Sequence, residues 1–195
     1  MNVTDLLNSD LGKQIISGIG GQTGTSTNQT ASVLSAALPA ILGGLQKNAT
    51  EGDGDGILGA LQSHDGGILD NLTDFLGNKN AVASDGNGIL GHVFGNQLGA
   101  VQKGISKKSG VDAGNVANII AMAAPVVMGI LGKQQRSAGV KDTSGLTDIL
   151  GGLLGGSGNS NIGSSIVSSL LDRDGDGKVE IDDVAGLLGG LLGRK

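Results

Sequence analysis

The chain has 195 residues, among them 38 glycines and two phenylalanines, and it contains no Trp, Tyr or Cys. The length suits one ordinary domain, but any core must be built from aliphatic side chains. Disulfides and thiolate metal sites are excluded. A net charge of -5 argues against nucleic-acid binding, because phosphate neutralisation needs clustered Lys and Arg, and base stacking needs aromatic rings.

The first 50 residues predict two amphipathic helices. Apolar residues recur at three- and four-residue spacing over residues 5–19, which is typical of a helix with one buried face. The sequence GGQTGTSTNQT that follows is expected to end this helix, and Thr25, Ser26 or Thr27 is expected to cap the next one. The second helix is expected to continue to about Leu45.

The first part of the chain is repeated later in the sequence. Residues 18–47 align without a gap on residues 104–133, so that Gly24 falls on Gly110 and Pro39 on Pro125; these are the only two prolines. The coincidence predicts a duplicated unit of helix, loop and helix. Since proline removes one backbone hydrogen bond, the second helix of each copy is expected to bend or end nearby.

The longest apolar run spans residues 119–131 and has helical spacing. The uncharged window around it, residues 113–132, contains Asn115, Asn118 and Pro125. A membrane-spanning helix needs roughly 20 predominantly apolar residues, and the uninterrupted apolar part is shorter than that. This window is therefore interpreted as a buried core helix.

These patterns divide the chain into a first helical unit at residues 1–50, an acidic glycine-rich connector at 51–84, a second helical unit at 85–136, and C-terminal helices at 137–195. The connector is expected to hold solvated turns, such as residues 51–56, and a short helix at 68–76. Residues 134–144 are interpreted as a solvated linker, and residues 145–156 as a short helix.

An acidic loop near the C-terminus has the spacing of an EF-hand. Residues 172–183 read DRDGDGKVEIDD, with Gly177 at position 6, where the loop turns sharply, and Val179 at position 8. Calcium prefers several oxygen ligands, and alternate residues of a tight loop direct them inward. The pattern predicts one Ca²⁺ ion, with ligands Asp172, Asp174, Asp176, Lys178 through its backbone carbonyl, Glu180 and Asp183.

One residue departs from the usual EF-hand pattern. Position 12 is Asp183, one methylene shorter than the usual bidentate glutamate. Loops of this form resemble the calcium loops of dockerin modules, in which aspartate takes that place. An acidic turn without an ion, or a site for magnesium, remains the alternative.

A second, degenerate copy of this loop is expected at residues 63–77. Asp65 and Gly66 match Asp176 and Gly177, but Leu61 and Ser63 stand where the early aspartates would be. This copy is interpreted as a turn without an ion.

No catalytic constellation is recognised. His64 and His92 are the only histidines, no cysteine accompanies them to complete a zinc shell, and no nucleophile-elbow signature is present. His92 is interpreted as a structural histidine, and the protein is expected not to be an enzyme.

The segment at residues 88–133 resembles the bacterial YidB-like family, catalogued as domain of unknown function nine-three-seven. The residues that carry the resemblance are ILGHVFG at 89–95, Ser109 with Gly110, and the apolar close at 123–132. It extends over residues 6–133 and implies an all-helical fold. It implies no activity, because the family is uncharacterised.

The sequence therefore predicts an all-α protein in which two related helical units form a compact bundle, with a helix–loop–helix calcium loop at the C-terminus. The function expected is a non-enzymatic structural or protein-interaction module. The alternative is a membrane-active or self-assembling protein, since ILGGLLGG and LLGGLLG place small residues where helices approach closely. A homo-oligomer or a separate protein partner is left open, and a cytoplasmic location is expected because Asp5 and Asp10 replace a basic signal region.

Overall fold

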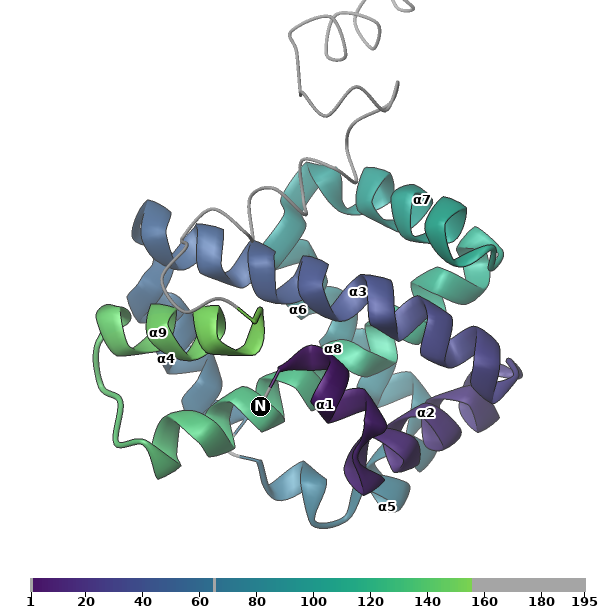
Figure 1. Ribbon diagram of the computed structural model, residues 1–195, viewed down its shortest axis with the longest axis horizontal. Helices are drawn as coiled ribbons and strands as arrows, with labels where there is room; N and C mark the ends of the chain where they lie inside the picture. The colour runs from purple at the N-terminus through teal and green to yellow at the C-terminus, as the bar shows by residue number, and fades with distance from the viewer. Residues whose placement is uncertain (1, 65, 156–195) are drawn as a thin grey trace, which may run out of the picture.

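The computed structural model describes residues 2–64 and 66–155, and this part of the chain is helical and has no strand (Figure 1). The predicted calcium loop at 172–183 lies outside it. The elements are α1 (Val3–Asn8), α2 (Asp10–Thr23), α3 (Thr27–Asn48), η1 (Ala49–Asp53), α4 (Gly54–Ser63), η2 (Gly67–Leu69), α5 (Leu72–Gly77), α6 (Lys79–Phe94), η3 (Gly95–Gln97), α7 (Leu98–Ser109), α8 (Ala113–Ser137) and α9 (Thr143–Leu153).

Helix α8 is the centre of the core. It packs against α2, α3, α4, α6, α7 and α9, and every residue from Ile119 to Gly129 is buried. By length and composition alone α8 could cross a membrane, yet 72% of its most apolar window is buried inside the protein. The prediction of a buried core helix is confirmed.

The duplicated unit appears in the structure as two helix pairs, α2 with α3 and α7 with α8. The first helix of each pair ends at a left-handed glycine, Gly24 at φ 71° and Gly110 at φ 70°, where a side chain would be strained. Ser26 and Asp112, which are equivalent in the alignment, cap the second helices. The two copies therefore share their turn as well as their sequence.

The two helix pairs are packed across one another. Helix α2 contacts α8 of the other pair, α7 contacts α3, and α3 contacts α8. The hydroxyl of Ser32 on α3 donates a hydrogen bond to the carbonyl of Ser109 at the end of α7, at 3.3 Å. Each pair thus completes the core of the other.

Both prolines lie inside continuous helices. Helix α3 runs past Pro39 to Asn48, and α8 runs past Pro125 to Ser137, so neither helix ends at its proline. Pro125 has no N–H, and the carbonyl of Ala121, one turn earlier, loses its usual donor. Gly86 of α6 packs directly on that carbonyl, and a Cβ at Gly86 would overlap the oxygen.

The helix expected over residues 5–19 is interrupted, so this prediction is wrong. Ser9 is extended at φ -70° and ψ 164°, and its hydroxyl accepts a hydrogen bond from the N–H of Gly12 at 3.0 Å, which starts α2. A Cβ at Gly12 would overlap the carbonyl of Leu6. Glycine at this position lets α2 fold back closely on α1.

Helix α2 also continues through Gly20 and Gly21, where the sequence predicted its end. A Cβ at Gly20 would lie 3.0 Å from the hydroxyl oxygen of Thr30. The glycine therefore permits close packing of α2 on α3 rather than breaking the helix.

Two expected loops are helical instead. Residues 51–56, expected to be a solvated turn, form the end of η1 and the start of α4, and the chain kinks inside η1 at Gly52, where φ is 114°. Residues 134–137, expected to begin a linker, form the last turn of α8, where Gln135 is only 6% exposed. The short helix expected at residues 145–156 is confirmed as α9.

Candidate functional site

The predicted calcium ligands are Asp172, Asp174, Asp176, Lys178, Glu180 and Asp183, and all of them lie outside the described residues. The chemistry of the described part is therefore built from other groups. Within residues 2–64 and 66–155, no group of three or more His, Asp or Glu side chains is close enough to hold a metal ion.

The degenerate loop at residues 63–77 keeps its turn. Gly66 has φ 88°, a conformation that favours glycine, and it is followed by η2 and α5. Ile68 then packs on Gly129 of α8, where a Cβ would lie 2.8 Å from the isoleucine side chain. This segment is held by apolar packing against the core helix.

Both histidines form hydrogen bonds to aspartates across the same pair of segments. His64, at the C-terminal end of α4, lies with Nε2 3.0 Å from Oδ2 of Asp85 on α6. His92, near the end of α6, lies with Nε2 2.6 Å from Oδ2 of Asp53, which precedes α4. The two pairs connect α4 and α6 at both ends of α4.

The two histidines differ in the hydrogen bonds of their ring nitrogens and in their exposure to solvent. Nδ1 of His64 lies 3.0 Å from the carbonyl oxygen of Ala60, so both ring nitrogens face acceptors. The side chain of His64 is 19% exposed, whereas that of His92 is 64% exposed. In the described part of the chain, no Ser or Thr hydroxyl bonds to either ring, so neither pair forms the beginning of a nucleophilic triad. The prediction of a structural His92 agrees with this geometry.

A groove of about 600 Å³ lies between α4 and the turn after α8. Nε2 of Gln135 donates a hydrogen bond to the carbonyl of Val140 at 2.9 Å, while its Oε1 is buried without a hydrogen-bond partner. No His, Asp or Glu lines this groove, and its charged residues are Arg136 and Lys141. Its lining consists of Leu58, Gln62, Gln135, Arg136, Gly139, Val140 and Lys141.

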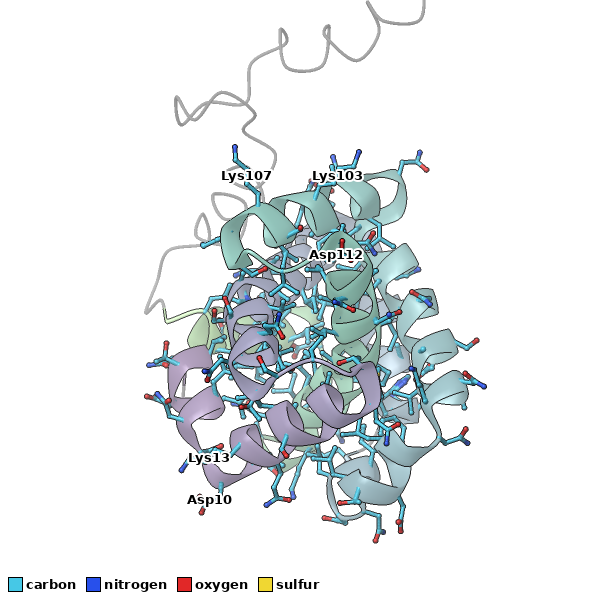
Figure 2. All side chains as sticks on the ribbon, turned by 90° about the vertical axis from the view of Figure 1, so that its right-hand side faces the viewer. Asp10, Lys13, Lys103, Lys107 and Asp112 are labelled. Atoms are coloured by element: carbon cyan, nitrogen blue, oxygen red, sulfur yellow. The ribbon has the colours of Figure 1, made fainter. Side chains whose placement is uncertain are left out.

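Helix α7 carries a cluster of exposed lysines in a chain whose net charge is negative. Lys103, Lys107 and Lys108 are exposed, and Figure 2 shows Lys103 and Lys107 pointing away from the body of the protein. None of the three takes part in an ion pair within the described residues. No Asp or Glu occurs between Asp85 and Asp112.

These observations define a class: an all-helical protein built on a duplicated helix pair, whose two described histidines each pair with an aspartate between α4 and α6. The model of a family of bacterial proteins of unknown function (DUF937) matches residues 5–134. The chain belongs to this family, as the resemblance of residues 6–133 predicted. No curated protein and no solved structure matches it.

The two His–Asp pairs were missed by sequence reasoning. Their partners are separated by 21 and 39 positions, and no local pattern marks them. The pairs form because α4 and α6 lie close together, and this arrangement depends on how both helices pack on α8.

Proposed function

We propose that this protein is a non-enzymatic calcium-binding module, in which the helical body carries one EF-hand-like loop at residues 172–183. The observation that supports this most directly is the spacing of the oxygen ligands. Asp172, Asp174 and Asp176 stand at positions 1, 3 and 5, the carbonyl of Lys178 at position 7, and Glu180 and Asp183 at positions 9 and 12.

Electrostatics gives the reason for an ion in this loop. Two carboxylates about 4 Å apart repel each other by about 4 kcal/mol at an effective dielectric of 20. The loop brings six acidic residues into twelve positions, so its compact form is unfavourable while it is empty. A divalent cation cancels this repulsion, and calcium accepts the six to eight oxygens that such a loop offers.

The described chemistry favours a binding role over catalysis. His64 has both ring nitrogens directed at acceptors, and the groove beside Gln135 is lined without a His, Asp or Glu. General acid–base catalysis needs a titratable side chain positioned to exchange a proton with a substrate. A structural or protein-interaction role, with a protein partner or a second copy, is the function proposed.

Isothermal titration of calcium into the full chain tests this proposal. We expect one ion per chain in the wild type and loss of the binding heat in Asp172→Ala, which removes the first ligand. Asp74→Ala in the degenerate loop is the matched control and should bind as the wild type does. No binding by the wild type would refute the proposal and leave residues 172–183 as an acidic turn. Tighter binding of magnesium than of calcium would overturn the assignment of calcium as the bound ion.

The alternative is a membrane-active or self-assembling protein, and its support is the glycine- and leucine-rich sequence of residues 149–156 and 187–193. In α9, however, Leu146, Ile149, Leu150 and Leu153 face the core and are buried. Co-sedimentation with anionic liposomes separates the two functions. A module that binds only calcium stays in the supernatant, whereas a membrane-active protein pellets with the vesicles.

A further inference from the structure

Helix α9 packs on an apolar surface of the helical body, which we call the α9 groove. It contacts α3, α4, α8 and η1, and Figure 1 shows it at the left of the view, beside α3 and α4. It lies beyond residue 134, where the family match ends. The side chains that fill the groove are Leu146, Ile149, Leu150 and Leu153, all of them at most 9% exposed.

The start of α9 lies close to α4, and leucines of α9 fill the groove further along. A Cβ at Gly54 of α4 would lie 2.9 Å from the Cβ of Thr143, so the two helices approach closely there. At the other end, Leu153 lines a small apolar cavity of about 20 Å³ together with Leu42 and Leu131. The positions of the apolar side chains along a helix therefore determine whether it fits this groove.

The chain contains a second segment with the same pattern. Residues 149–155 read ILGGLLG and residues 187–193 read LLGGLLG, and they differ only in the first residue. In this register, the four groove-filling side chains of α9 correspond to Val184, Leu187, Leu188 and Leu191. Each buried position of α9 therefore has an aliphatic counterpart.

We propose that residues 184–192 are an alternative occupant of the α9 groove and exchange with α9 within one chain. Residues 138–183 connect the end of α8 to this segment, and at about 3.3 Å per extended residue they can span up to about 150 Å. Two segments tethered to one groove meet it at an effective concentration that is set by the length of the connecting chain, not by the protein concentration. Exchange within a chain is therefore favoured over exchange between dilute chains.

Differences at the helix start make α9 the principal occupant. Asp142 caps α9 by accepting a hydrogen bond from the N–H of Gly145 at 2.8 Å. The equivalent residue in the second segment is Glu180, which is a poorer N-cap than aspartate. Residues 184–192 accordingly occupy the groove in the minor population, and weakening α9 shifts the balance towards them.

Thermal unfolding of full-length variants in the presence of a chelator tests the exchange without involving calcium. Leu150→Asp disables α9 and Leu188→Asp disables its counterpart. The single Leu188→Asp change should leave the melting temperature unchanged, and the double variant should lose more than the two single variants together. Gly152→Asp and Gly190→Asp are matched controls, because Gly152 is exposed on α9. A double variant no less stable than Leu150→Asp alone would overturn the proposal.

Disulfide trapping gives a second readout that does not depend on stability. The chain has no cysteine, so an introduced pair reports a single contact. The pair Gly54→Cys and Thr143→Cys, with no further substitution, should form a disulfide, because these residues lie in contact. Gly54→Cys with Ile181→Cys, the equivalent pair, should oxidise within one chain once Leu150→Asp is present, and should cease to do so when Leu188→Asp is added. Absence of this bond, or its formation only between chains, would overturn exchange within one chain.

Discussion

The contact between Gly86 and the carbonyl of Ala121 predicts that one added methyl group separates two helices. In Gly86→Ala, the new Cβ would overlap the Ala121 oxygen, and backbone atoms on both sides leave no flexible side chain to move away. Overpacking of this kind costs typically 1–3 kcal/mol, whereas replacing glycine by alanine inside a helix gains about 1 kcal/mol. Because the overlap is severe, we take the upper end of the overpacking cost, about 3 kcal/mol. After subtraction of the gain in helix propensity, the free energy of unfolding should fall by about 2 kcal/mol.

Gly88→Ala is the matched control, because Gly88 lies two residues further along α6 and is exposed, and a Cβ added there would meet no atom within 4 Å. Only the helix propensity changes at this position, so stability should rise by about 1 kcal/mol. For a protein of this size, 1 kcal/mol corresponds to about 2–4 °C in melting temperature.

Urea denaturation and thermal unfolding of the two variants measure these differences. The melting temperature should fall by about 4–8 °C in Gly86→Ala and rise by about 2–4 °C in Gly88→Ala. A shift of the same sign in both variants would refute the reasoning, because it would mean that propensity alone decides and that α6 does not press on Ala121.

The remaining predictions concern the turns and the His–Asp pairs, and urea denaturation checks each of them. Gly24→Ala and Gly110→Ala should each lower stability by about 1–2 kcal/mol, because both residues are left-handed; clearly unequal losses would contradict the equivalence of the two units. Asp112→Ala should cost about 1 kcal/mol by removing the cap of α8, and Asp112→Asn should restore most of it. His64→Ala should cost about 1–2 kcal/mol, since two hydrogen bonds are lost, whereas the exposed pair of His92 should contribute less than about 1 kcal/mol. Equal losses at the two histidines would argue against this ranking.

The parts of the fold that could be predicted from sequence are those with a local cause. The apolar spacing of residues 119–131 predicted the centre of α8, and the choice between Thr25, Ser26 and Thr27 correctly included the cap of α3. The alignment of Pro39 with Pro125 predicted the duplicated unit. The first two depend on neighbouring residues alone, and the third depends on a repeat that is visible in the sequence itself.

The missed features depend on contacts between distant segments. Glycine-rich sequence predicts a helix break at Gly20 and in residues 51–56, but at Gly20 the glycine lets α2 approach Thr30. Whether a glycine ends a helix or admits a neighbouring helix depends on what packs against it. The His–Asp pairs have the same origin, and the predicted calcium ligands lie in a part of the chain that the structure does not describe.

The crossed packing of the two helix pairs has a consequence for one unit in isolation. In the full chain, α2 rests on α8 and α7 rests on α3, so a peptide containing a single pair would expose the apolar faces that the other pair covers. A second copy of the same peptide, related by a twofold axis, would repeat the contacts of α2 with α8 and of α7 with α3. The two helix pairs are in this sense arranged like the subunits of a homodimer that have been joined into one polypeptide.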